Sequence, residues 1–126
     1  MHGISAAAIF VGAGLGALLR WALGLALNPV FPTLPLGTLA ANALGSLLIG
    51  IALGVFAQFE SVSPVVRLAV TTGFLGGLTT FSAFSGESLA LLRHGDLGLA
   101  AAHTLAHVLG ALFAAWLGMR LAQALI

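Results

Sequence analysis

Residues 73–87, which read GFLGGLTTFSAFSGE, decide the fold of this chain. The stretch is apolar enough to enter a membrane, but it is rich in glycine, threonine and serine and poor in strong helix formers. Irregular backbone at membrane depth is tolerated only where it is buried in protein or lines a cavity. A broken membrane helix also frees carbonyl groups that can coordinate a cation. We therefore predict a membrane helix that is broken near Gly76 and Gly77.

The composition of the whole chain is that of a membrane protein. Its 126 residues are 60% hydrophobic and only 6% charged, whereas a soluble domain carries about 25% charged residues. This balance excludes a soluble enzyme, a nucleic-acid-binding protein and a disordered chain. The length allows one domain, and no nucleotide-binding motif is present. The chain has no cysteine, so disulfides and thiolate metal sites are excluded as well. It also has no lysine.

Four stretches are long and apolar enough to cross a bilayer core about 30 Å thick, which takes roughly 20 helical residues. Prolines between residues 29 and 35 end the first stretch, and Ser63-Pro64 has the pattern of a helix N-terminus. The N-terminus lacks the basic flank of a signal peptide, so we expect the first span to be retained. The sequence predicts one all-α domain with spans at about 6–27, 36–57, 66–92 (broken near 76–79) and 97–121.

The arginines give no preferred orientation in the membrane. An excess of basic residues normally marks the cytoplasmic side, but Arg20 and Arg93 fall on one side and Arg67 and Arg120 on the other. We therefore expect insertion in both orientations, and the two products to pair antiparallel. Small residues at four-residue spacing, which let membrane helices approach closely, also favour a homo-oligomer.

The second span places Thr38, Asn42 and Ser46 on one face, at successive four-residue steps. The two hydroxyls can each donate a hydrogen bond to a backbone carbonyl one turn earlier in the same helix. The Asn42 amide has two donors and two acceptors, and hydrogen bonds to its own helix backbone cannot satisfy all of them. It therefore either bridges two helices or contacts a permeant ion.

Aromatic and histidine pairs follow in the last two spans. Phe81 and Phe84 lie three residues apart, and beside a polar path their ring edges can face an anion without a full positive charge; core packing is the alternative. His103 and His107 share a helix face. A zinc site needs more ligands than these two, and we expect no acid near them, so they either donate N–H groups to an aqueous track, relay protons or make ordinary hydrogen bonds.

Three motifs together resemble the CrcB/Fluc family of fluoride channels: GALLRW at 16–21, GTLAANALGS at 37–46, and residues 73–87. The resemblance covers the whole chain in order and spacing. It implies four-helix subunits in an antiparallel, dual-topology homodimer with two separate pores. It also implies a structural Na⁺ at the dimer centre, held by the backbone carbonyls of Gly76 and Thr79.

The resemblance assigns roles to further residues. Family members often have a threonine at Ala83 and a serine at Ala111, so here Ser82 and His107 would have to supply the polar track. Glu87 ends the third-helix motif, and we expect a vestibule or helix-end role for it, as for Thr38 and His103. The fluoride path would comprise the pore-facing Asn42, the ring edges of Phe81 and Phe84, Ser82, His107 and the vestibule residue Arg20.

The expected function is passive, fluoride-selective export across the cell (inner) membrane, with no enzymatic activity and no nucleotide or nucleic acid partner. Fluoride is strongly hydrated, so its passage requires donors that replace water, and a lysine in the pore would hold it too tightly. A proton-coupled exporter of organic cations is the alternative, but it needs a membrane-embedded carboxylate, for which Glu87 is the candidate. An assembly subunit without transport activity is a third possibility.

Overall fold

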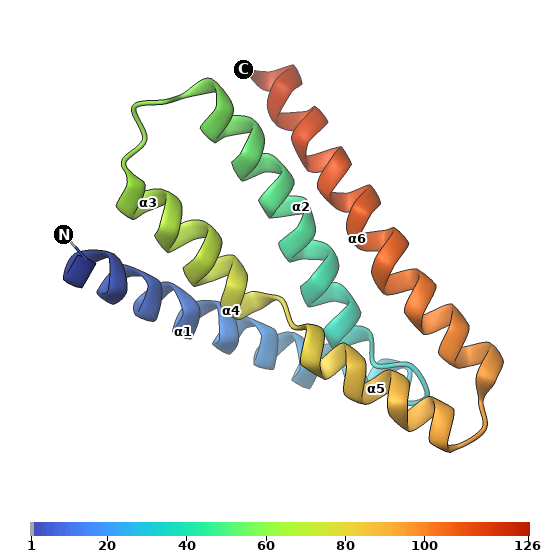
Figure 1. Ribbon diagram of the computed structural model, residues 1–126. Helices are drawn as coiled ribbons and strands as arrows, with labels where there is room; N and C mark the ends of the chain where they lie inside the picture. Colours follow the sequence, from blue (N-terminus) through green and yellow to red (C-terminus); the bar gives the residue numbers. More distant parts are fainter. Residues whose placement is uncertain (1) are drawn as a thin grey trace.

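The structure is a computed structural model that describes residues 2–126, and all regular elements in this range are helical (Figure 1). Four helical stretches are long and apolar enough to cross a membrane. The predicted all-helical fold with four such stretches is thus confirmed. Along the chain the elements are α1 (His2–Leu27), η1 (Asn28–Val30), α2 (Leu36–Gln58), α3 (Pro64–Leu68), η2 (Ala69–Leu75), α4 (Gly76–Leu78), α5 (Phe81–Arg93) and α6 (Leu97–Leu125).

Local sequence signals explain where these helices begin and end. Ser63 caps α3, because its Oγ accepts a hydrogen bond from the Val66 amide at 3.3 Å, and Pro64 occupies the first helical turn. Thr80 caps α5 in the same way through the Ala83 amide at 3.0 Å. Between α5 and α6 the chain turns at Gly95, whose φ of 77° is easily adopted only by glycine.

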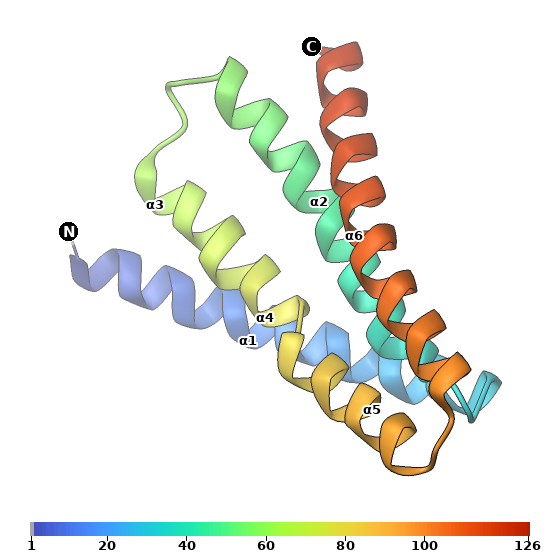
Figure 2. The same ribbon diagram turned by 45° about the vertical axis from the view of Figure 1, so that its right-hand side comes forward.

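The helices pack as two pairs. The rod formed by α3, η2 and α4 lies along α1, whereas α2 packs along α6, and both views show this arrangement (Figures 1 and 2). Glycine makes the close approaches possible. A Cβ at Gly77 would meet the backbone of Ala13 in α1, and a Cβ at Gly118 would meet the backbone of Leu47 in α2. Such small-residue contacts drive helix association in lipid, where the hydrophobic effect between helices is absent.

Helical structure is interrupted at Thr79 and Thr80, at the end of the predicted range 76–79. Gly76 and Gly77 are helical and form α4 with Leu78. Thr79 (φ −87°, ψ 154°) and Thr80 (φ −150°, ψ 117°) are extended, and α5 begins at Phe81. The interruption thus overlaps the predicted range 76–79 at Thr79, whereas Gly76 and Gly77 themselves stay helical. Glycine at 77 allows close packing against α1, whereas Thr80 is held by a side chain of α2, as described below.

The residues before the interruption are also unusual, because η2 forms π-helical turns over Ala69–Leu75. Such turns are rare, and they occur frequently at functional sites. Leu75 at their end is buried with Ala41 and Leu78 in the apolar core of the bundle. The outer faces of α1 and α6 instead expose large apolar side chains, among them Phe10 and Leu109. A lipid-facing or subunit-facing surface requires such side chains.

Candidate functional site: a groove at the helix interruption

A groove of about 550 Å³ opens beside the interrupted helix. Four of the predicted fluoride-path residues, Asn42, Phe81, Phe84 and His107, line it together with Gly76 and Thr79. Ala111, which stands where members of the resembled family often have a serine, lines the groove too. Ser82 is exposed and does not line the groove, and its hydroxyl lies 3.3 Å from the Thr80 hydroxyl. The remaining lining residues are Gly45, Ser46, Ile49, Thr71, Leu75, Thr80, Val108 and Leu112.

Asn42 bridges α2 to the extended residues. Its Oδ1 accepts a hydrogen bond from the Thr80 amide at 2.8 Å, and its Nδ2 donates to the Thr80 carbonyl at 3.1 Å. Its Nδ2 also lies 3.1 Å from Nδ1 of His107. Of the two predicted possibilities for Asn42, the structure has the interhelical bridge. The same side chain lines the groove, so the bridge lies at the groove wall.

The bridge leaves backbone carbonyls free at the groove. In an unbroken helix the Thr80 amide would donate to the Gly76 carbonyl, but here it donates to Asn42 Oδ1. The Ala83 amide would donate to the Thr79 carbonyl in an unbroken helix, but here it donates to the Thr80 hydroxyl. The next carbonyl, that of Gly77, accepts from Nε of Arg20 at 3.1 Å. The carbonyls at Gly76 and Thr79, the predicted Na⁺ ligands, thus lack their usual helical donors.

Two phenylalanines form part of the groove wall at the start of α5. Phe81 is 78% exposed in the single chain, whereas Phe84 is buried. Their ring centroids lie 5.4 Å apart at an interplanar angle of 63°, so the edge of one ring faces the other. Phe84 also stacks on His103, with 5.2 Å between centroids, and contacts His107 at 4.6 Å. Phe84 therefore connects the groove to the histidine pair.

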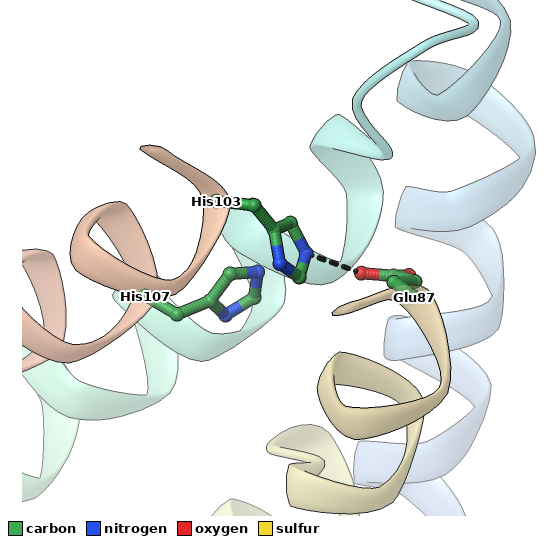
Figure 3. A group of neighbouring side chains, drawn as sticks. All are labelled: Glu87, His103 and His107. Atoms are coloured by element: carbon green, nitrogen blue, oxygen red, sulfur yellow. Dashed lines mark hydrogen bonds and ion pairs between the residues drawn. The ribbon is translucent and has the colours of Figure 1, made fainter. Parts of the chain in front are cut away.

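A polar cluster around Glu87 adjoins Phe84, whose ring stacks on His103. Figure 3 shows Glu87 with His103 and His107. Oε1 of Glu87 lies 3.0 Å from Nε2 of His103, and its Oε2 accepts from the Thr38 hydroxyl at 2.5 Å. Nδ1 of His103 lies 2.9 Å from the Ser88 hydroxyl. Two expectations were wrong here. An acid does lie beside the histidine pair, and the Thr38 hydroxyl bonds a carboxylate rather than its own helix backbone.

The second histidine of the pair has an unsatisfied nitrogen. His107 is only 5% exposed, and its Nε2 has no hydrogen-bond partner within residues 2–126. Ligand atoms of Glu87, His103 and His107 all lie within 4.8 Å of one another. By distance alone these three side chains could hold a metal ion.

Sequence reasoning did not single out Thr80 or Ser88 as site residues. Thr80 acts through its backbone and through a capping hydroxyl, and only its position in the unusual stretch signals that role. Ser88 contacts His103 across helices. No spacing rule within one helix predicts such a contact.

Comparison with known proteins places the chain in a family. The family model described as "CrcB-like protein, Camphor Resistance (CrcB)" matches residues 7–119. A protein of Aromatoleum aromaticum named "Fluoride-specific ion channel FluC" is 57% identical over 111 residues, which cover 88% of this chain and 85% of that one. Proteins with the same name from Ralstonia pickettii (53%, covering 94% of each chain) and Chromobacterium violaceum (54%, 89% of each) are also similar.

These relatives are named as channels and not as enzymes. Together with the four apolar helices, the comparisons identify a multi-pass membrane protein. The resemblance carried by residues 16–21, 37–46 and 73–87 is confirmed, because the match extends over nearly the full chain. The chain belongs to the CrcB family.

Proposed function

We propose that this protein is a fluoride-selective channel through which F⁻ leaves the cell passively, down its electrochemical gradient. The observation that carries the proposal is the groove, in which Asn42, Phe81, Phe84 and His107 converge beside the helix interruption. Relatives at 53–57% identity are named fluoride-specific channels. Export of this kind would protect the cytoplasm from fluoride that enters as neutral HF and ionises inside.

The chemistry of the groove suits a small, strongly hydrated anion. Passage requires groups that replace water but release the ion again, since conduction fails if binding is too strong. The lining supplies partial charges rather than a full positive charge, such as the Ser46 hydroxyl and the aromatic ring edges of Phe81 and Phe84. No lysine is present in the sequence. Arg20 is half-buried and donates from Nε to the Gly77 carbonyl at 3.1 Å, and it is not among the residues that line the groove.

A single chain leaves this site incomplete, so we propose an antiparallel, dual-topology homodimer with two pores. Phe81 is exposed although its neighbour Phe84 is buried, and a second subunit would cover it. The free carbonyls of Gly76 and Thr79 would then meet their symmetry-related copies at the dimer centre. Carbonyl oxygens suit a hard cation, so these groups fit a structural Na⁺ and would hold the two interrupted helices together.

One observation favours a second candidate, a proton-coupled exporter. Glu87 lies within a membrane-spanning helix and pairs with the buried His103 at 3.0 Å, and such a pair can exchange protons. Glu87→Gln separates the two functions. An exporter would lose the coupling between substrate and proton movement, whereas a channel would still conduct fluoride passively.

The decisive experiment is fluoride efflux from liposomes that contain the purified protein, with chloride as the control anion. We expect fast fluoride efflux with chloride retained. Phe81→Ile should abolish the efflux, because it removes a ring edge from the groove. Phe10→Ile is the matched control, since Phe10 is 81% exposed on α1 and does not line the groove. The absence of fluoride efflux from a folded wild-type dimer would refute the proposal.

A further inference from the structure

A histidine pair one helical turn apart on α6 meets an acid of α5. His103 and His107 stand four residues apart, and their ring centroids lie 4.6 Å apart. Two histidines alone supply too few ligands for a zinc site. The structure adds a third, because ligand atoms of Glu87, His103 and His107 all lie within 4.8 Å of one another (Figure 3). Two imidazoles and one carboxylate are a ligand set that transition-metal dications use.

One nitrogen of this cluster is unsatisfied. Nε2 of His107 is buried and has no hydrogen-bond partner within residues 2–126, and the residue is only 5% exposed. Buried polar atoms are normally paired with protein or with water. Figure 3 shows the His107 ring pointing toward His103 and Glu87, so this nitrogen faces the other two ligands. A metal ion between the three side chains would give it a partner.

The other two ligands already have the outer partners that metal sites use. A metal-bound histidine is usually oriented through its second ring nitrogen, and a metal-bound carboxylate accepts a further hydrogen bond. Nδ1 of His103 lies 2.9 Å from the Ser88 hydroxyl. Oε2 of Glu87 accepts from the Thr38 hydroxyl. Oε1 of Glu87 and Nε2 of His103, which lie 3.0 Å apart, are then the atoms left to bind the ion.

An ion can reach the cluster from the water. Glu87 lines a second cavity, of about 340 Å³, and its side chain is 18% exposed. Pro32 and Thr33, between η1 and α2, and Asp96, between α5 and α6, line the same cavity. These connecting segments lie at one end of the molecule (Figure 1). His107 lines the groove instead, so the cluster lies between the cavity and the groove.

We propose that Glu87, His103 and His107 form a binding site for a transition-metal dication such as Zn²⁺, and that the bound ion inhibits fluoride conduction. Inhibition rests on the proposed function, whereas the site itself does not. Because His107 lines the groove, a doubly charged cation beside it would hold fluoride too tightly for rapid release. Mg²⁺ prefers oxygen ligands, so it should not occupy the site.

Binding has a cost at Asn42. Its Nδ2 lies 3.1 Å from Nδ1 of His107. An amide nitrogen can only donate, so Nδ1 accepts and the proton of the neutral ring sits on Nε2 in the free protein. A metal takes the Nε2 lone pair, so this proton moves to Nδ1 and the hydrogen bond is lost. One neutral hydrogen bond corresponds to roughly tenfold in affinity, and Zn²⁺ binding to protein sites exceeds this by orders of magnitude.

Co²⁺ is the probe for this site, used with the full-length protein in detergent micelles. Four-coordinate Co²⁺ absorbs visible light far more strongly than hydrated, octahedral Co²⁺. We expect strong bands from one Co²⁺ for each chain, displaced by Zn²⁺ but not by Mg²⁺. Glu87→Gln and His107→Gln should each lose the bands. His94→Gln is the matched control and should keep them, because His94 lines the cavity but lies outside the cluster.

Two further measurements test the outer partner and the inhibition. Thr38→Val removes the donor to Glu87 and should weaken Zn²⁺ binding by about tenfold. In liposomes, Zn²⁺ should slow fluoride efflux through the wild type and through His94→Gln, and a chelator should restore it. Zn²⁺ should leave the efflux that remains in Glu87→Gln unchanged.

The outcomes separate the metal site from the proposed function. A wild type that conducts fluoride but shows no four-coordinate Co²⁺ would refute the site and leave the channel assignment intact. Bands that persist in both folded variants would place the ion elsewhere and refute it too. If the variants do not fold, X-ray absorption of the Zn²⁺-bound wild type decides, and a shell without imidazole refutes the site. Wild-type efflux unaffected by bound Zn²⁺ would overturn the inhibition. The expected bands without fluoride efflux from metal-free protein would refute the proposed function alone.

Discussion

Gly77→Ala gives the sharpest test of how α1 packs on the interrupted helix. A Cβ at this position would lie 2.8 Å from the carbonyl carbon of Ala13 and 2.9 Å from its Cα, and it would also meet the carbonyl oxygen. These neighbours are backbone atoms, so no side chain can rotate away. The two helices would have to separate, and we expect the variant to be less stable than the wild type.

The magnitude follows from three contributions. Overpacking by one methyl group costs about 1–3 kcal/mol. Separation of the helices would also stretch the 3.1 Å hydrogen bond from Arg20 Nε to the Gly77 carbonyl, and a bond to a charged group contributes about 1.5–3 kcal/mol. Alanine regains about 1 kcal/mol of helix propensity. The free energy of unfolding should therefore fall by about 1.5–5 kcal/mol.

The assay is equilibrium unfolding in detergent micelles, followed by circular dichroism. Gly110→Ala is the control, because a Cβ on Gly110 in α6 meets nothing within 4 Å, and it should be neutral or stabilising by up to about 1 kcal/mol. In a double-mutant cycle, Arg20→Met should cost less when Gly77→Ala has already broken their bond. Gly77→Ala as stable as Gly110→Ala would refute the packing described for α1 and α4.

Three further predictions concern the cluster, the cation and the topology. Thr38→Val removes the hydroxyl that donates to Glu87 and should lower the free energy of unfolding by about 1.5–3 kcal/mol. Ser46→Ala is the control and should change this free energy little, because the Ser46 hydroxyl has no partner in residues 2–126. Equal effects of the two variants in thermal unfolding would contradict the prediction. Replacing Na⁺ by a bulky organic cation should abolish fluoride efflux and weaken the dimer, as seen by liposome flux and cross-linking, and full activity without Na⁺ would exclude the structural ion. Reporters fused to the C-terminus should be found on both sides of the membrane; a single location would exclude dual topology.

The sequence predicted the larger features because they depend on composition and order. A chain that is 60% hydrophobic with 6% charged residues cannot cover a soluble surface, and apolar runs of about 20 residues place the four spans. The glycine, threonine and serine in residues 73–87 also indicated an interruption, because they weaken a helix wherever they lie. Asn42, Phe81, Phe84 and His107, grouped by the family resemblance, do line one groove.

The exact place of the interruption was not predictable from propensity. Glycine is the poorer helix former, yet Gly76 and Gly77 are helical and the two threonines are extended. Tertiary contacts explain the difference, since Gly77 is needed where α1 approaches and Thr80 is held by Asn42 from α2. A propensity scale contains neither contact.

The sequence by itself therefore determined that the protein is a four-span, all-helical membrane protein with one irregular span. Only the tertiary structure decided that Asn42 bridges to Thr80, that Glu87 pairs with His103, and that Nε2 of His107 has no hydrogen-bond partner within residues 2–126. The physical reason is the distance along the chain over which each interaction acts. Hydropathy and propensity act along the chain, whereas a hydrogen bond depends on where a partner 16 to 65 residues away lies in space. Inside a membrane, where water cannot substitute for a missing partner, those long-range pairings define the site.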